Sequence, residues 1–189
     1  DFRSPLNRMP RAVFLDRDGT LIEDAHYLKD PNKIRIINRT EEALVKMKEA
    51  GYLLFMHTNQ SGIARGYYGW DDVHACNQRM LELLNLKNDF WDGICVAPES
   101  PDEKEAGYRK PSEKYQLEMI SKYGLTPSSS WMVGDKWIDA ETGLKAKLNG
   151  ALVKTGKVIG QEVEKLAREK NVPICENLFS FTNTYLINT

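Results

Sequence analysis

Short apolar runs alternate along the chain with longer stretches in which apolar residues recur at helical spacing. The apolar runs have strand length, and we predict strands at residues 12–15, 52–56, 93–96, 130–134 and 151–153. The periodic stretches predict helices at residues 41–50, 70–84, 112–123, 138–148 and 158–170. Continuous apolar strands are typical of parallel strands covered on both faces. The pattern therefore predicts an α/β fold with a doubly wound, mostly parallel sheet and no large cap domain.

Local signals suggest where some elements begin and end. Thr40 is a candidate N-cap of the first helix, which Gly51 would end. Pro111 is expected at the first position of the third helix, where its missing N–H is not needed. Residues 34–37 fit a short strand or an extended segment. The tail from Ile174 fits a last short strand followed by a helical turn.

The bulk composition restricts the class of partner. The chain has 189 residues and a formal net charge of −1, so it lacks the basic field that holds nucleic acid backbones. No apolar run approaches the roughly 20 residues needed to span a bilayer, and no secretory signal is visible. We expect a small-molecule partner, no nucleic acid, no membrane, and a monomer or weak dimer.

Cysteine usage and the start of the chain suggest its location and domain limits. Cys76, Cys95 and Cys175 are odd in number and widely spaced, which favours free thiols in a reducing cytoplasm over a disulfide framework. Residues 1–9 are interpreted as an N-terminal tail left by trimming or tagging. Residues 10–189 contain no linker or repeat, and we expect them to form a single domain.

Two carboxylates follow the first predicted strand where it ends. Asp16 and Asp18 come directly after the apolar run, and Gly19 follows them. Ligands of open α/β sheets bind outside the carboxyl ends of the strands. Adjacent negative charges repel unless a cation or a shared proton relieves them, and Mg²⁺ takes oxygen ligands and engages substrate phosphates. The pair therefore predicts a magnesium site, the alternative being a solvated acidic turn.

Three further predicted strands also lead into polar residues. These are Thr58, Asn59 and Gln60 after the second, Arg109 and Lys110 beyond the third, and Asp135 and Lys136 after the fourth. Parallel strands end at one edge of a sheet, so these side chains should converge on one crevice. A lysine alone is usually solvated surface, and only the position beside strand ends argues for a site. At this position Lys136 would offset part of the negative charge of the carboxylates and contact substrate oxygens.

This set of side chains predicts phosphoryl transfer. Asp16 is the candidate nucleophile, since a carboxylate can attack phosphorus and form an aspartyl-phosphate. Asp18 would protonate the leaving oxygen and later deprotonate the attacking water. Asp135 would complete a metal site with Asp16 and a backbone carbonyl near Asp18. Thr58 and Lys110 would stabilise the charge on the transferring phosphoryl group.

The same strings resemble the four motifs of the haloacid dehalogenase (HAD) superfamily of phosphohydrolases. They are Asp-Arg-Asp-Gly-Thr at residues 16–20, Thr58, Lys110 and Gly134-Asp135, and the resemblance spans about residues 11–160. The longer strings at residues 14–20, 58–66, 109–111 and 133–136 are similar to those of D-glycero-D-manno-heptose 1,7-bisphosphate 7-phosphatases. The related histidinol-phosphatases share much of this pattern.

The resemblance implies a site, a cofactor and a pathway. Asp16 would be the nucleophile, Asp18 the general acid/base, Thr58 and Lys110 the phosphoryl-binding pair, and Asp16, Asp18 and Asp135 the Mg²⁺ ligands. The substrate site that it implies comprises Asp24, Ala25, His26, Tyr27, Asn59, Gln60, Ser61, Arg109 and Lys136. Arg109 would help to recognise a sugar bisphosphate, a precursor of ADP- or GDP-heptose and so of lipopolysaccharide. Loops 21–33, 61–69 and 98–109 would shape the site in place of a cap.

One departure from the family pattern concerns zinc. The resembled phosphatases commonly bind a structural zinc before the Arg-Lys-Pro string, through a Cys-x-His pair and later cysteines. This chain has Ala97-Pro98-Glu99 and Gly107-Tyr108 there, and alanine and tyrosine cannot ligate zinc as thiolates do. We predict that the chain binds no zinc. Packing through Pro98, Pro101 and Tyr108 would hold the loop instead.

Several functions compete at this point. The leading hypothesis is removal of the 7-phosphate of a heptose bisphosphate, and histidinol-phosphate hydrolysis is the first alternative. A nucleic-acid 3′-phosphatase is a second, because such enzymes share Thr-Asn-Gln and Tyr-Arg-Lys-Pro strings, although the chain lacks a basic stripe. A catalytically silent HAD-like module that binds a sugar phosphate is the alternative from another class. The Asp16–Asp18 pair argues against that module, since binding alone does not need it.

Overall fold

The computed structural model describes residues 9–103 and 107–187. Its centre is one sheet of six parallel strands in the order β3-β2-β1-β4-β5-β6. The strands are β1 (Ala12–Leu15), β2 (Leu53–Asn59), β3 (Gly93–Ala97), β4 (Trp131–Gly134), β5 (Asn149–Val153) and β6 (Ile174–Cys175). The chain moves outward from β1 to β3 and then returns to β4 on the other side of β1. The junction of β1 and β4 is therefore the topological switch point, where open α/β sheets bind ligands.

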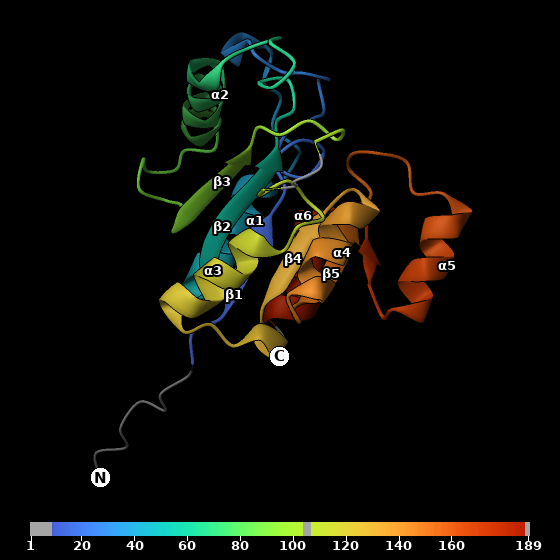
Figure 1. The fold of residues 1–189 in the computed structure, drawn as a ribbon. Coiled ribbons are helices and arrows are strands. Elements are labelled where there is room, and N and C mark those ends of the chain that lie inside the picture. The colour runs from blue at the N-terminus through green and yellow to red at the C-terminus, as the bar shows by residue number, and fades with distance from the viewer. Residues whose placement is uncertain (1–8, 104–106, 188–189) are drawn as a thin grey trace.

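Helices cover both faces of the sheet, which gives three layers (Figure 1). They are α1 (Thr40–Glu49), α2 (Trp70–Leu83), α3 (Lys114–Tyr123), α4 (Trp137–Lys145), α5 (Gln161–Glu169) and α6 (Leu178–Phe181), the last continued by a π-helix (Thr182–Ile187). Helices α1, α2 and α6 pack on one face, and α3, α4 and α5 on the other. Among the described residues, no helix combines the length and apolarity required to cross a membrane.

The core forms because successive residues of each strand point to opposite faces. Val13 and Leu15 of β1 pack toward α1, while Ala12 and Phe14 pack toward α3. Phe14 stacks on Phe55 of β2 at a ring-centroid distance of 4.8 Å. All four residues of β1 are buried, which confirms the sequence-based reading of a continuous apolar run as a doubly covered strand.

Three predicted helix ends were wrong. Arg39 is the N-cap of α1, with a left-handed φ of 64°, while the Thr40 hydroxyl donates backward to the carbonyl of Ile37 at 2.7 Å. Pro111 lies outside α3, which begins at Lys114 after a turn that follows the cis Lys110–Pro111 bond. Helix α4 ends at Lys145, three residues before the predicted end at 148, and Asn149 opens β5. Each prediction assigned a residue by local propensity, which tertiary packing overrode.

Other boundaries moved by a few residues. Strand β2 continues three residues beyond the predicted end, through Asn59, because β3 pairs with it as far as Ala97. Helix α5 begins at Gln161 instead of residue 158, and Val158 stands 90% exposed. Ile36 makes a single antiparallel bridge with Ile22, so residues 34–37 are an extended segment rather than a strand. The tail does form a short strand and helical turns.

Candidate active site

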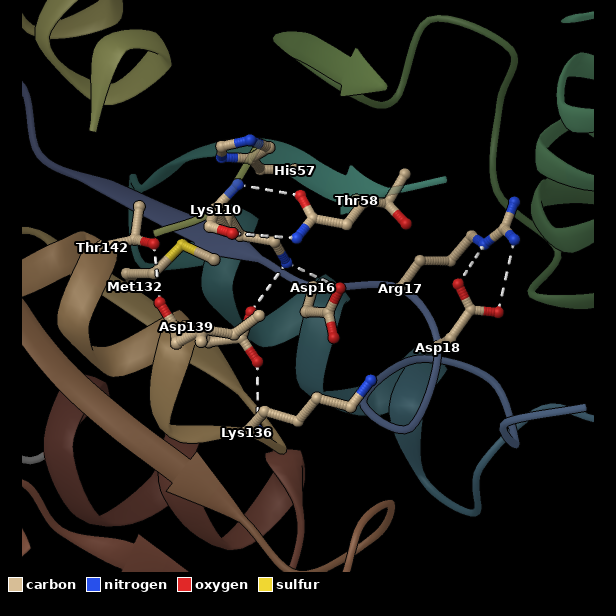
Figure 2. Close-up of polar contacts among 12 residues, drawn as sticks. Asp16, Arg17, Asp18, His57, Thr58, Lys110, Met132, Lys136, Asp139 and Thr142 are labelled. Atoms are coloured by element: carbon tan, nitrogen blue, oxygen red, sulfur yellow. Dashed lines mark hydrogen bonds and ion pairs between the residues drawn. The ribbon is translucent and has the colours of Figure 1, made fainter. Parts of the chain in front are cut away.

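A buried ion-paired group lies at the switch point between β1 and β4. The Nζ of Lys110 donates to Oδ1 of Asp16 at 2.8 Å and to Oδ1 of Asp139 at 2.7 Å (Figure 2). All three side chains are buried. Asp16 follows β1 directly, and Asp139 stands in the first turn of α4, after β4. The fold therefore places a lysine ammonium between two carboxylates whose positions are set by adjacent strands.

Three carboxylates at this point could share one metal ion. Oxygens of Asp16, Asp135 and Asp139 lie within 4.8 Å of one another, and all three residues are buried. Burial, and then repulsion from Asp139, raise the pKa of Asp16 well above its ordinary range, although Lys110 opposes the rise. Burial and Asp139 also raise the pKa of Asp135. Such mutual repulsion among desolvated carboxylates is what a bound divalent cation relieves.

The bonding of Asp135 fits a metal ligand. Its Oδ2 accepts a hydrogen bond from the backbone N–H of Lys157 at 2.8 Å, whereas its Oδ1 is buried without a hydrogen-bond partner. A buried acceptor without a donor is costly, and an ion would satisfy it. Gly19, with φ +83°, and Gly156 press against this carboxylate so closely that a Cβ on either would overlap it. The backbone therefore forms a close cradle around Asp135.

The side chain of Asp18 turns away from this centre. Its Oδ2 accepts from Nε of Arg17 at 3.1 Å and its Oδ1 accepts from Nη2 of Arg17 at 3.3 Å (Figure 2). Its Oδ2 also accepts from Nε2 of Gln60 at 3.0 Å. Arg17 is fully buried and also donates to Asn77 of α2 at 2.9 Å. Among the described residues, the three-carboxylate cluster therefore includes Asp16 and Asp135, as predicted, but not the Asp18 carboxylate.

Asp139 was missed by the sequence reading, which considered only Asp135 after β4. A detectable signal was present, since the first turn of a helix that directly follows a strand lies at the edge of the sheet where that strand ends. Asp139 falls in the first turn of the helix predicted at residues 138–148. Its Oδ2 accepts the backbone N–H of Lys136 at 3.1 Å, so it also caps α4. Its other oxygen is thereby directed toward Lys110.

Neighbours of Thr58 on β2 hold the turn that carries Lys110. Asn59 accepts the backbone N–H of Lys110 at 2.9 Å and donates to its carbonyl at 3.2 Å. His57 bonds the carbonyl of Tyr108 through Nε2 at 2.7 Å and Gln116 of α3 through Nδ1 at 2.8 Å. Burial, then the charge of Lys110, lower the pKa of His57 to about 3. This ring is therefore neutral and structural, a role for which the sequence offered no signal.

Glu99 joins the two ends of loop 98–109. Its Oε1 accepts the backbone N–H of Tyr108 at 3.1 Å, and its carbonyl accepts Nη1 of Arg109 at 3.2 Å. The Tyr108 hydroxyl donates to the Glu118 carboxylate on α3 at 3.0 Å. Residues 104–106 of this loop lie outside the described part of the chain. The sequence analysis expected packing to hold these segments and did not consider Glu99. In the structure, hydrogen bonds of Glu99 link them. The absence of zinc stays a prediction.

The predicted substrate residues 24–27 form an exposed rim. Asp24, Ala25, His26 and Tyr27 are all exposed, and His26 and Tyr27 have left-handed φ values of 46° and 56°. The Tyr27 ring meets that of Tyr67 edge-on at 4.9 Å. Ser61 is half-buried.

Two further predicted cations, Lys136 and Arg109, have different surroundings. Lys136 is half-buried and adjoins a cavity of about 370 Å³ that Asp135 also lines. Burial opposes a charge on Lys136, but Asp135 and Asp16 outweigh it and raise the pKa of this lysine. Arg109 is half-buried beside the loop. In the described part of the chain, no carboxylate lies within ion-pair distance of it, and burial lowers its pKa.

Comparisons with known proteins assign the family. A protein-family model described as HAD-hydrolase-like matches residues 107–180. A D-glycero-beta-D-manno-heptose-1,7-bisphosphate 7-phosphatase of Pasteurella multocida is 39% identical over 165 residues, covering 84% of this chain and 90% of the relative. The chain belongs to this family of HAD-like phosphatases. A phosphatase of the same name from Haemophilus influenzae is 37% identical over the same shares of both chains.

A solved structure matches the fold of this phosphatase. It is a D,D-heptose 1,7-bisphosphate phosphatase of B. bronchiseptica, complexed with magnesium and phosphate. The two chains superpose with a TM-score of 0.81 over 95% of this chain and 99% of the other, at 24% sequence identity. The sheet flanked by helices is thus the HAD-like fold, which confirms the predicted fold class.

Proposed function

We propose that the chain hydrolyses the 7-phosphate of D-glycero-D-manno-heptose 1,7-bisphosphate through an aspartyl-phosphate intermediate. The observation that carries the proposal is the buried group formed by Asp16, Lys110, Asp135 and Asp139. Its carboxylates and single ammonium match the needs of phosphoryl transfer, in which the protein mainly positions and neutralises charge. The choice of a heptose bisphosphate as substrate is supported by the names of the similar phosphatases of Pasteurella multocida and Haemophilus influenzae.

In the first step, an oxygen of Asp16 attacks the phosphorus of the 7-phosphate. The Asp16 O–P bond forms as the bond from phosphorus to the sugar oxygen breaks, and Asp18 gives that oxygen a proton. In the second step, the deprotonated Asp18 takes a proton from a water molecule, whose oxygen attacks the same phosphorus. The bond to Asp16 breaks, and inorganic phosphate leaves.

The residues of the cluster fit a magnesium ion. Asp16, Asp135 and the backbone carbonyl of Asp18 would hold it, with Asp139 close enough to contribute. When bound, the ion would neutralise charge on the phosphoryl oxygens and on the clustered carboxylates. The orphaned Oδ1 of Asp135 supports this assignment.

Lys110 and Thr58 would bind the transferring phosphoryl group. Lys110 is held between Asp16 and Asp139. Burial by itself would lower the pKa of Lys110, but these two carboxylates outweigh burial and raise it. The lysine therefore stays charged, and it can share that charge with phosphoryl oxygens as they arrive beside Asp16. Asp139 would keep the ammonium in place throughout the cycle. Arg109, free of a carboxylate partner among the described residues, would meet the distal phosphate.

The test is a turnover panel on the purified chain. We expect the highest kcat/KM for heptose 1,7-bisphosphate, assayed as each anomer, compared with histidinol phosphate and a 3′-phosphorylated oligonucleotide. A chelator of divalent ions should abolish turnover and added Mg²⁺ should restore it. Preference for either alternative substrate would overturn the assigned substrate, and turnover that is indifferent to chelation would overturn the metal site.

The cellular setting belongs to the same proposal. A substrate with two phosphate groups does not cross membranes unaided, because charge is costly in hydrocarbon. We place the enzyme in the cytoplasm, acting as a monomer or weak dimer on a free sugar phosphate that leads to ADP- or GDP-heptose. Gel filtration and cell fractionation test these two points directly.

A further inference from the structure

The side chain of Gln60 is fully engaged inside the protein. Its Nε2 donates to the hydroxyl oxygen of Thr58 at 2.7 Å and to Oδ2 of Asp18 at 3.0 Å. Its Oε1 accepts the hydroxyl of Tyr68 at 2.6 Å. Gln60 is 4% exposed. Both amide hydrogens are therefore committed, which leaves Gln60 no donor for a substrate.

Tyr68 determines which way the Gln60 amide faces. An amide oxygen can only accept, so the Tyr68 hydroxyl must donate to it. If the amide were reversed, its oxygen would face the Asp18 carboxylate, and both groups would be acceptors. The Tyr68 hydroxyl stabilises the orientation in which the NH₂ group faces Asp18 and Thr58. Burial raises the pKa of Tyr68 to about 12, so the hydroxyl keeps its proton.

The loop between β2 and α2 is shaped to hold Tyr68 at this place. The Tyr68 ring lies directly on Gly62, where any Cβ would overlap it. Tyr68 is 8% exposed, whereas its neighbour Tyr67 is 51% exposed. The Tyr68 hydroxyl is thus buried although Tyr68 lies in a surface loop, and it bonds the amide of Gln60 just after β2. This arrangement indicates a specific positioning contact.

We propose that Tyr68 is a positioning residue that acts through Gln60 on Asp18 and Thr58. This inference rests on the proposed phosphatase function. Because Thr58 Oγ1 accepts from Gln60, its own hydrogen is free to point at a phosphoryl oxygen. The same amide holds the carboxylate of Asp18, together with Arg17. Tyr68 thus couples the phosphoryl-binding hydroxyl to the acid that protonates the leaving group, and Gln60 moves from the substrate-lining set to a supporting role.

The experiment compares Tyr68→Phe with wild type on phenyl phosphate and p-nitrophenyl phosphate. The value of kcat/KM reports the steps up to leaving-group departure. The p-nitrophenolate ion leaves without protonation, while phenolate is a stronger base and benefits from an acid. We expect kcat/KM to fall about tenfold more for phenyl phosphate than for p-nitrophenyl phosphate, since one supporting hydrogen bond is lost. An equal fall on both substrates, or no fall, overturns the proposal.

A matched variant and a double mutant separate positioning from general destabilisation. Tyr123→Phe removes a hydroxyl that donates to the Asp92 carbonyl at 3.0 Å in the α3 region, and it should leave the ratio of the two kcat/KM values unchanged. Gln60→Met should change that ratio at least as much as Tyr68→Phe. Adding Tyr68→Phe to Gln60→Met should then change nothing further, because Tyr68 acts only through Gln60. Additive losses would overturn the coupling.

The wild-type enzyme distinguishes failure of this inference from failure of the proposed function. If wild type hydrolyses neither aryl phosphate nor any substrate of the turnover panel, the phosphatase proposal itself fails. If wild type is active and Tyr68→Phe matches it on both aryl phosphates, only the role of Tyr68 fails. The aryl pair makes the result independent of the sugar that the enzyme prefers.

Discussion

The floor and the rim of the active site are held in opposite ways. The floor, formed by Asp16, Lys110, Asp135 and Asp139, is buried and bonded at adjacent strand ends. The rim at residues 24–27 is exposed, and it makes a turn hydrogen bond and edge-on aromatic contacts. Charge stabilisation needs fixed groups in a dry place, while recognition of a particular sugar can vary with surface loops. The difference suggests that reaction type and substrate choice are separable in this fold.

The largest effect should come from replacing the nucleophile. Asp16→Asn should lower kcat at least about 10³-fold on every substrate, because an amide oxygen is a poor nucleophile and the step has no substitute. The fold should persist, since asparagine has the same shape and relieves repulsion from Asp139 and Asp135. Circular dichroism and steady-state kinetics check both points. Near-normal turnover by this variant would contradict the covalent mechanism.

The next largest effect should come from removing the positive charge of Lys110 from the floor. Lys110→Met should lower kcat/KM about 10²–10³-fold and reduce the free energy of unfolding by about 3 kcal/mol, because Asp16 and Asp139 are left unpaired in a buried place. Urea unfolding and kinetics measure the two losses. Adding Asp139→Asn should return part of the stability but none of the activity. The exposed Lys165→Met on α5 is the control and should change neither.

Recognition of the second phosphate outside the floor is tested by a substrate comparison. Arg109→Ala should reduce kcat/KM for heptose bisphosphate roughly 10–100-fold more than for p-nitrophenyl phosphate, since only the former has a second phosphate to bind. Most of the loss should appear in KM. Equal losses on both substrates would show that Arg109 supports the floor through the Glu99 loop instead of recognising the sugar bisphosphate.

A final effect, on the pH dependence of stability, concerns the buried ring beneath the Lys110 turn. Burial lowers the pKa of His57 to about 3 in the folded protein, against an ordinary 6.5. Between pH 3 and pH 6.5, the His57 side chain therefore binds a proton in the unfolded chain but not in the folded protein. The free energy of unfolding therefore has its full His57 contribution above pH 6.5 and loses it as pH falls toward 3, by at most about 1.4 kcal/mol per pH unit.

His57→Gln should flatten that dependence, because glutamine does not titrate. Urea unfolding at several pH values between 4.5 and 7 measures the slope. The exposed His74→Gln on α2 is the matched control and should leave the slope as in wild type. An unchanged slope in His57→Gln would mean that other groups cause any acid destabilisation.

The sequence by itself determined the parallel sheet, the polar residues that follow its strands and most residues of the floor. Buried parallel strands appear as continuous apolar runs, and the polar residues that follow them must gather at one edge. Asp16, Lys110 and Asp135 were predicted in this way, and the structure brings their side chains together. Their catalytic roles remain proposals for the experiments above.

Only the tertiary structure decided how these side chains are bonded. The contact of Lys110 with Asp139, that of His57 with Gln116 and that of Tyr68 with Gln60 each depend on how separate elements or loops pack. A periodic pattern reports which face of an element is buried, but a hydrogen bond needs two particular atoms within about 3 Å of each other. Such proximity arises from the packing of the whole chain, and no local stretch of sequence contains it.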